Sequence, residues 1–155
     1  MKVLMVCLGN ICRSPMAQGV LEKKIVERSL SHWFVDSAGT SGWHDGERPD
    51  HRAVLTSSQN GVDISMQISR KITKKDLMIF DFVLAMDTSN YNDILKLCDS
   101  EEEVHKVKML MNYQYENQNR AVPDPYYDGR FDEVFQLLNE SLDCFLDKVL
   151  VSERI

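Results

Sequence analysis

The chain has 155 residues, 43% of them hydrophobic and 27% charged, proportions typical of an ordinary folded protein and not of a disordered or membrane protein. Its 18 basic and 24 acidic residues give a net charge of −6 without a basic stripe, which argues against a nucleic-acid surface. We therefore expect one domain over residues 1–155, with no nucleic-acid or membrane partner.

The N-terminus begins MKVLMVCLGN, whose apolar run is too short for a secretory leader. We therefore expect a cytoplasmic protein. Its four cysteines should then be reduced, so a close pair indicates catalysis, redox sensing or metal binding before it indicates a structural disulfide.

The first predicted element is a buried strand, Lys2 to Val6, which ends at a loop that contains glycine. Ser14 is a good N-cap residue, and Pro15 suits the first position of a helix because its missing N–H costs nothing there. Apolar residues then recur at helical spacing, which predicts a helix to about Arg28.

Strand and helix patterns alternate through the middle of the chain. Residues 33–40 (WFVDSAGT) predict a second strand, and residues 52–59 a helix that ends at an Asn-Gly pair. Residues 80–87 (FDFVLAMD) predict a third, fully buried strand. A helix is expected over 88–98 and a fourth, weaker strand over 104–111 (VHKVKMLM).

A long helix is predicted from Phe131 to Val149, where apolar residues recur at steps of three and four. The alternating order of elements predicts an α/β fold, a three-layer sandwich whose central four-stranded parallel sheet carries helices on both faces. Ligands of such sheets bind beyond the carboxyl ends of the strands. The loop over residues 7–14 lies at that position.

This loop, CLGNICRS, has the features of an anion-binding site. Successive backbone N–H groups and a helix N-terminus attract negative charge, and the planar guanidinium group of Arg13 can bind two phosphate oxygens at once. A Walker loop would have lysine before the Ser/Thr. The same donors would stabilise a thiolate at Cys7, so the spacing C-x-x-x-x-x-R-S predicts a nucleophile that attacks a phosphoryl group without metal or cofactor. Ser14 could donate a hydrogen bond to the sulfur.

Four segments together resemble the low molecular weight protein tyrosine phosphatases: VCLGNICRSPMAQGVL, VDSAGTSGWHDG, ITKKDLMIFDFVLAMDTSN and VPDPYYDG. They occur in the family's order over nearly the whole chain. The resemblance implies a flavodoxin-like strand order, 2-1-3-4, and hydrolysis of phosphotyrosine and small aryl phosphates through a phosphocysteine. It also implies phosphotyrosine-containing proteins as partners, inorganic phosphate or other oxyanions as product or inhibitor, and a monomeric protein.

The resemblance assigns a role to each matching residue. Cys7 becomes the nucleophile, Arg13 the phosphate-binding arginine and Ser14 the serine that stabilises the departing sulfur. Asp124 becomes the general acid that protonates the leaving phenolate. The phosphate is bound by the backbone amides of Leu8, Gly9, Asn10, Ile11 and Cys12. An aromatic rim around the substrate ring is made by Trp43, Tyr126 and Tyr127.

Three further residues are expected to support the loop. Asp87, which follows the third strand, should support the loop or cap a helix. Many family members have a histidine in the segment that matches DISMQISRKIT, and Gln67 stands in that place here. We expect Asn10, which tolerates a left-handed backbone, to form a network with Ser37, Ser14 and Gln67.

The second cysteine of the loop, Cys12, has two interpretations. The family resemblance implies a reversible disulfide with Cys7, which would protect the nucleophile from deeper oxidation. Alternatively, Cys12 is only a small buried hydrophobic residue, as we expect for Cys98 and Cys144.

Four other functions fit the sequence less well. A metal site is disfavoured because the four histidines are dispersed. Arsenate reductases of similar fold need two cysteines after the third strand, where this chain has only Cys98. Protein-arginine phosphatases typically have threonine at the position of Ile11. A non-catalytic phosphotyrosine-binding module would have lost Cys7 or Asp124.

Overall fold

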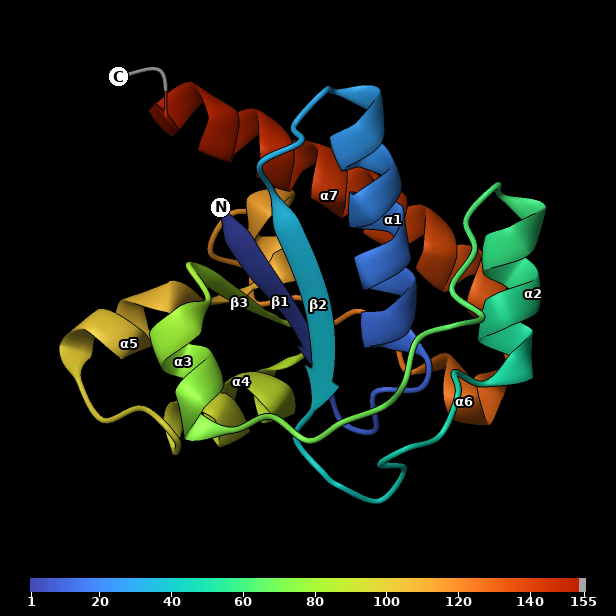
Figure 1. Ribbon diagram of the computed structural model, residues 1–155, viewed down its shortest axis with the longest axis horizontal. Coiled ribbons are helices and arrows are strands. Elements are labelled where there is room, and N and C mark those ends of the chain that lie inside the picture. The colour runs from blue at the N-terminus through green and yellow to red at the C-terminus, as the bar shows by residue number, and fades with distance from the viewer. Residues whose placement is uncertain (154–155) are drawn as a thin grey trace.

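Four parallel strands form the central sheet of the computed structural model, which describes residues 1–153 (Figure 1). The strands lie in the order β2-β1-β3-β4, which confirms the predicted α/β architecture and strand order. In the register of the sheet, Val6 on β1 lies between Ala38 on β2 and Ala85 on β3. The strands are β1 (Lys2–Cys7), β2 (Phe34–Gly39), β3 (Phe82–Ala85) and β4 (Val107–Met109).

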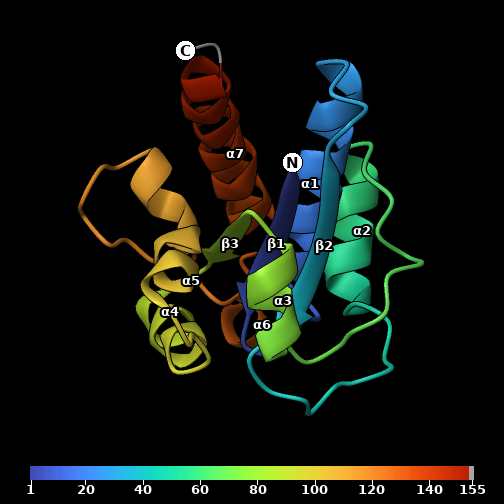
Figure 2. The same cartoon turned by 60° about the vertical axis from the view of Figure 1, so that its left-hand side comes forward.

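Helices cover both faces of this sheet (Figures 1 and 2). One face carries α1 (Arg13–Glu27), α2 (His51–Gln59) and α7 (Phe131–Glu153). The other carries α3 (Lys74–Ile79), α4 (Thr88–Leu95) and α5 (Glu101–Lys106). A 3₁₀ helix (Leu110–Tyr113) and the four-residue helix α6 (Pro125–Asp128) complete the described elements.

The side chains of β1 point alternately to the two faces of the sheet, so this strand contributes to two separate hydrophobic cores. Val3 and Met5 pack toward α1 and α7, whereas Leu4 and Val6 pack into the second core, and all four are fully buried. A strand buried on both faces reads as a continuous apolar run, which is why the sequence pattern identified it.

Two sequence predictions about these elements are wrong. Helix α1 begins at Arg13 with Cys12 as its N-cap, so Ser14 lies in the first turn and does not cap the helix. The predicted strand over 104–111 is reduced to Val107–Met109. Residues 104–106 instead continue α5, because Ser100 caps that helix and three glutamates favour its first turn.

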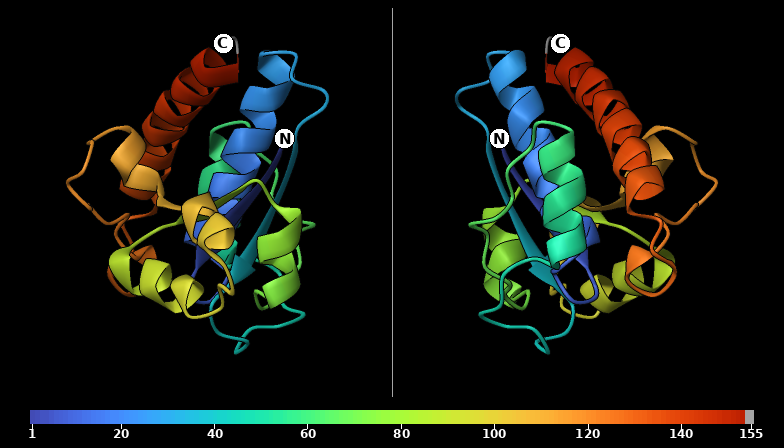
Figure 3. Two further views of the ribbon diagram at one scale, coloured as in Figure 1. Left: turned by 90° about the vertical axis from the view of Figure 1, so that its left-hand side faces the viewer. Right: turned by 90° about the vertical axis from the view of Figure 1, so that its right-hand side faces the viewer.

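The loops that follow the carboxyl ends of the strands gather at one edge of the sheet, at the bottom of Figure 1. The loop after β1, the segment after β2 and helix α6 all lie there, and Figure 3 shows the same grouping from both sides. Within residues 1–153, no helix combines the length and apolar character needed to cross a membrane.

Candidate active site

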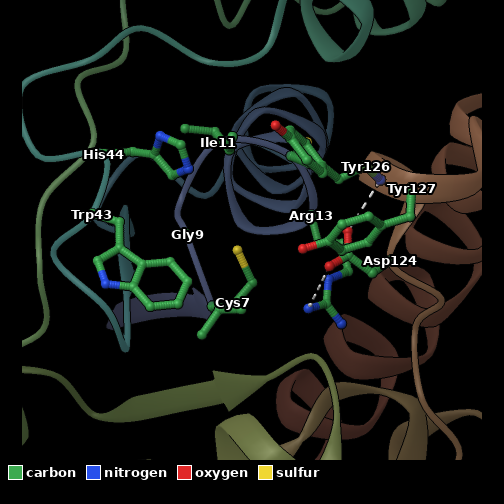
Figure 4. A pocket seen from close by; sticks show the side chains of 11 residues that line it. Cys7, Gly9, Ile11, Arg13, Trp43, His44, Asp124, Tyr126 and Tyr127 are labelled. Atoms are coloured by element: carbon green, nitrogen blue, oxygen red, sulfur yellow. Dashed lines mark hydrogen bonds and ion pairs between the residues drawn. The ribbon is translucent and has the colours of Figure 1, made fainter.

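A pocket of about 230 Å³ opens at this edge of the sheet (Figure 4). The sulfur of Cys7 lies between Trp43 and His44 on one side and the α6 segment on the other. Its lining combines residues 7–13, the segment after β2 and the α6 segment: Cys7, Leu8, Gly9, Ile11, Cys12, Arg13, Trp43, His44, Asp124, Tyr126 and Tyr127. The structure therefore brings Cys7, Arg13 and Asp124 to one pocket, with most of the loop and the aromatic rim. Ser14 is fully buried and does not line this pocket.

The Cys7 sulfur lies at the end of β1, with the Ser14 hydroxyl 3.0 Å away. Asn10 Nδ2 donates to the same hydroxyl oxygen at 2.8 Å, which occupies one of its lone pairs. The Ser14 proton can then go to the sulfur or to the Ala38 carbonyl oxygen, which lies farther away at 3.4 Å. This arrangement favours a hydrogen bond from Ser14 to the sulfur.

Asn10 holds the loop in shape from a left-handed backbone conformation, with φ of 57°. Its Nδ2 donates to Ser37 Oγ at 3.0 Å as well as to Ser14, and its Oδ1 accepts from the backbone N–H of Arg70 at 3.0 Å. Ser69 Oγ donates to the Asn10 carbonyl oxygen. All the hydrogen-bonding groups of the Asn10 side chain are thus used to fix the loop.

The prediction that Gln67 joins this network is wrong. Its Nε2 donates instead to the Pro15 carbonyl oxygen at 3.1 Å, and its buried Oε1 has no hydrogen-bond partner within residues 1–153. Ser69 and Arg70, which the sequence did not single out, make the contacts to Asn10 from the same segment.

Replacement of Asn10 by alanine should destabilise the protein by about 3 kcal/mol, because a left-handed alanine is strained and three polar partners lose their hydrogen bonds. Equilibrium urea unfolding measures this loss. Asn119, which is also left-handed but lies on an exposed loop, provides the matched control Asn119→Ala. A loss at Asn10 no larger than that at Asn119 would contradict the role of this network.

Arg13 is buried, and the hydrogen bonds that hold its guanidinium group are both made by Nη1. Nη1 donates to Asp87 Oδ2 at 2.7 Å and to the Val122 carbonyl oxygen at 3.0 Å. Burial by itself lowers the pKa of Arg13, but the charges of Cys7, Asp87 and Asp124 outweigh it and raise the pKa above its ordinary value. Arg13 is therefore a permanent cation beside the sulfur.

Asp87 combines the two structural functions expected of it. Its Oδ2 binds Arg13, and its Oδ1 accepts from the backbone N–H of Asn90 at 2.8 Å, which caps helix α4. The carboxylate thereby ties the arginine to the end of β3.

Asp124 is the N-cap residue of α6, and its carboxylate lies beside the Arg13 guanidinium. Its Oδ1 accepts from the Tyr126 backbone N–H at 3.1 Å, and its Oδ2 lies 3.7 Å from Arg13 Nη2. The rings of Tyr126 and Tyr127 pack edge to face with centroids 5.0 Å apart, and across the pocket Trp43 is 79% exposed. These apolar surfaces form a wall that suits a flat ring.

Cys12 also lines this pocket, and its surroundings disfavour ionisation of its thiol. Burial raises the pKa of its thiol, and the charges of Asp50, Cys7 and Asp124 raise it further, while Arg52 opposes them. Cys12 is therefore a protonated thiol at neutral pH. Both Cys7 and Cys12 are free cysteines in the structure.

His44 is a pocket residue that the sequence analysis missed, although it follows Trp43 directly in the quoted motif. Its ring packs over the loop, with Cδ2 3.1 Å from the position that a Cβ atom on Gly9 would occupy. Its Nδ1 pairs with Glu47. Within residues 1–153, no three or more His, Cys, Asp or Glu side chains are grouped to hold a metal ion.

The fold and the pocket define a class of protein, an α/β protein whose first loop brings a buried cysteine and a buried arginine into one pocket at the carboxyl edge of a parallel sheet. Residues 2–154 match the family model of the low molecular weight phosphotyrosine protein phosphatases. The chain belongs to this family.

Individual relatives agree with this assignment. The human low molecular weight phosphotyrosine protein phosphatase is 39% identical over 94% of each chain. A crystal structure of a protein tyrosine phosphatase from Entamoeba histolytica superposes with a TM-score of 0.91 at 34% identity over 99% of each chain. The Drosophila arginine phosphatase has a TM-score of 0.89 at 33% identity, over 96% of this chain and 98% of that one.

Proposed function

We propose that this protein hydrolyses phosphotyrosine in proteins, and small aryl phosphates, through a phosphocysteine intermediate on Cys7. The convergence of the Cys7 sulfur, the Arg13 cation and the Asp124 carboxylate in one aromatic-walled pocket carries this proposal. We further propose that the protein acts as a monomer in the cytoplasm, where its cysteines would stay reduced.

Substrate binding uses the loop amides and the free edge of Arg13. Within the described chain, the hydrogen bonds of the Arg13 guanidinium are made by Nη1, so Nε and Nη2 remain to bind two phosphate oxygens. The amides of residues 8–12 bind the remaining charge, which increases as the phosphoryl group is transferred. Inorganic phosphate and other oxyanions should occupy the same site as product or inhibitors.

The first chemical step transfers the phosphoryl group to sulfur. The Cys7 thiolate forms the S–P bond while the P–O bond to the tyrosine oxygen breaks, and Asp124 donates a proton to the departing phenolate. The tyrosine ring lies against Tyr126, Tyr127 and Trp43, and these contacts favour a flat aryl ester over a small alkyl phosphate.

The second step hydrolyses the phosphocysteine. Asp124, now ionised, accepts a proton from water as the water oxygen attacks phosphorus and the S–P bond breaks. The Ser14 hydroxyl, 3.0 Å from the sulfur, stabilises the thiolate as it leaves. Protons in this cycle pass only between Asp124, the phenolate and water, and Arg13, Ser14 and the loop amides stabilise the charges, so it needs no cofactor.

Ser14→Ala should lower kcat roughly ten- to a hundredfold, the value of one hydrogen bond to a charged group, because the leaving thiolate loses its donor. Hydrolysis of the intermediate should slow most, so rapid mixing with a nitrophenyl ester should give a clear burst of phenolate. Ser57→Ala, which removes a buried hydroxyl on α2 that has no partner within residues 1–153, is the matched control. An unchanged kcat in Ser14→Ala would contradict this role.

Activity assays in the presence of a chelator test the proposed function directly. Phosphotyrosine peptides and aryl phosphates should be hydrolysed at mildly acidic pH, with phosphoserine and phosphoarginine peptides far poorer substrates. Ile11 supports this preference over phosphoarginine, because its apolar side chain lines the pocket without a hydroxyl for a guanidinium. No turnover of aryl esters, or preferred turnover of phosphoarginine, would overturn the proposal.

A further inference from the structure

We propose that Arg52 is a positioning residue that holds the Asp124 carboxyl group over the Cys7 pocket. This inference depends on the proposed role of Asp124 as general acid. Arg52 lies on α2, more than seventy positions from Asp124 in the sequence, and it does not line the pocket. It would act through the backbone of the α6 segment.

The N-terminus of α2 is fixed to the phosphate-binding loop. The backbone N–H of Asp50 donates to the Ile11 carbonyl oxygen at 2.9 Å. The Asp50 side chain caps α2 by accepting from the Arg52 backbone N–H at 2.8 Å. The backbone of Arg52 is therefore linked to the loop through Asp50, by one hydrogen bond from Asp50 to Ile11 and one from Arg52 to Asp50.

Asp50 also fixes the orientation of the Arg52 guanidinium. Arg52 Nε donates to Oδ1 at 3.0 Å and Nη2 donates to Oδ2 at 2.9 Å, a bidentate pair. The hydrogen bonds from Arg52 lower the pKa of Asp50 in spite of its burial, so the pair stays ionic at mildly acidic pH. Two parallel bonds hold the plane of the guanidinium in one direction.

The oriented guanidinium holds the α6 segment at two places. Nη2 donates to the Tyr126 carbonyl oxygen at 3.2 Å, and the group lies over the Tyr126 ring at 5.5 Å. It also lies 4.8 Å from the ring centroid of Phe131, the first residue of α7. One cation thus joins both ends of residues 126–131 to the phosphate-binding loop.

Tyr126 connects this contact to the acid. Its backbone N–H donates to Asp124 Oδ1, while Arg52 binds its carbonyl oxygen. A shift of Tyr126 would therefore move the donor that orients the Asp124 carboxyl group. Helix α6 has only one buried residue, Pro125, so apolar packing does little to hold it in place.

Replacement of Arg52 by methionine keeps an unbranched side chain but removes the charge and its hydrogen bonds. We expect kcat/KM for aryl phosphates with poor leaving groups to fall roughly ten- to a hundredfold, and that for nitrophenyl esters to fall little, because only poor leaving groups need the proton. The parameter kcat/KM is appropriate because it covers the steps up to departure of the phenolate.

A double-variant comparison separates positioning from a general loss of structure. In the Asp124→Asn background, Arg52→Met should cause little further loss on poor leaving groups, since the acid it positions is already absent. Arg52→Lys should recover part of the rate. Arg130→Met removes a cation of the same segment that pairs with Asp128 and Glu133, and it should leave the leaving-group dependence unchanged.

The outcomes distinguish this inference from the proposed function. Equal losses over all leaving groups, or losses that multiply in the double variant, would overturn the role of Arg52 while the role of Asp124 stands. Absence of a leaving-group effect in Asp124→Asn alone would instead refute the general acid. Circular dichroism and urea unfolding verify that each variant folds. If Arg52→Met does not fold, the leaving-group and double-variant comparisons are made with Arg52→Lys, for which the same selective but smaller loss is expected.

Discussion

Cys7→Ser is expected to reduce kcat for any aryl phosphate by at least about ten-thousandfold, because a serine hydroxyl cannot replace a thiolate as nucleophile in this site. The rest of the anion site should survive, since Arg13 and the loop amides are unchanged. Calorimetric titration with inorganic phosphate should therefore still detect binding, while steady-state assays detect almost no turnover.

Cys144→Ser is the matched control, because Cys144 is a free, partly buried cysteine on α7 that lies away from the pocket. It should keep the wild-type rate. If Cys7→Ser retained more than a small fraction of turnover, or if Cys144→Ser lost as much, the assignment of the nucleophile would be wrong.

Asp124→Asn should lower kcat/KM for a phosphotyrosine peptide by about a hundred- to ten-thousandfold, the usual contribution of a general acid. The loss should be much smaller on a nitrophenyl ester, whose phenolate leaves without a proton. Asparagine can still accept the Tyr126 N–H and cap α6, so the segment keeps its position while only the transferable proton is lost.

Asp128→Asn serves as the control for this effect, since Asp128 lies in the same short helix and its side chain binds Arg130. It should change the rates on both substrates little. Equal losses on the peptide and the nitrophenyl ester in Asp124→Asn would count against the acid role.

The layered fold and the reactive loop could be predicted from the sequence because both depend on local patterns. The fully buried β1 reads as a continuous apolar run, and the stripe of α7 repeats at helical spacing. The short helices α3, α5 and α6 were not predicted, because each begins at a local cap and buries too few residues to show a helical period. In α3, for example, the main sequence indication of a helix is the capping box between Thr73 and Asp76, and only Asp76 and Leu77 are buried.

The residues that position the site were harder to predict, because tertiary contacts bring them together. Ser69 and Arg70 reach Asn10 from about sixty positions along the chain, and Arg52 binds the carbonyl oxygen of Tyr126, more than seventy positions away. No spacing rule connects such segments. Gln67 lies in the expected segment, but its amide bonds the first turn of α1 instead of the loop asparagine.

Trapping of the intermediate tests the central claim most directly. The wild-type protein is mixed rapidly with phosphate-labelled aryl phosphate, quenched in acid and digested, and the labelled peptide is located by mass spectrometry. We predict one phosphoryl group on the sulfur of Cys7, with more of it in Ser14→Ala and none in Cys7→Ser. Label on another residue, or turnover in Ser14→Ala without any labelled enzyme, would contradict the phosphocysteine mechanism.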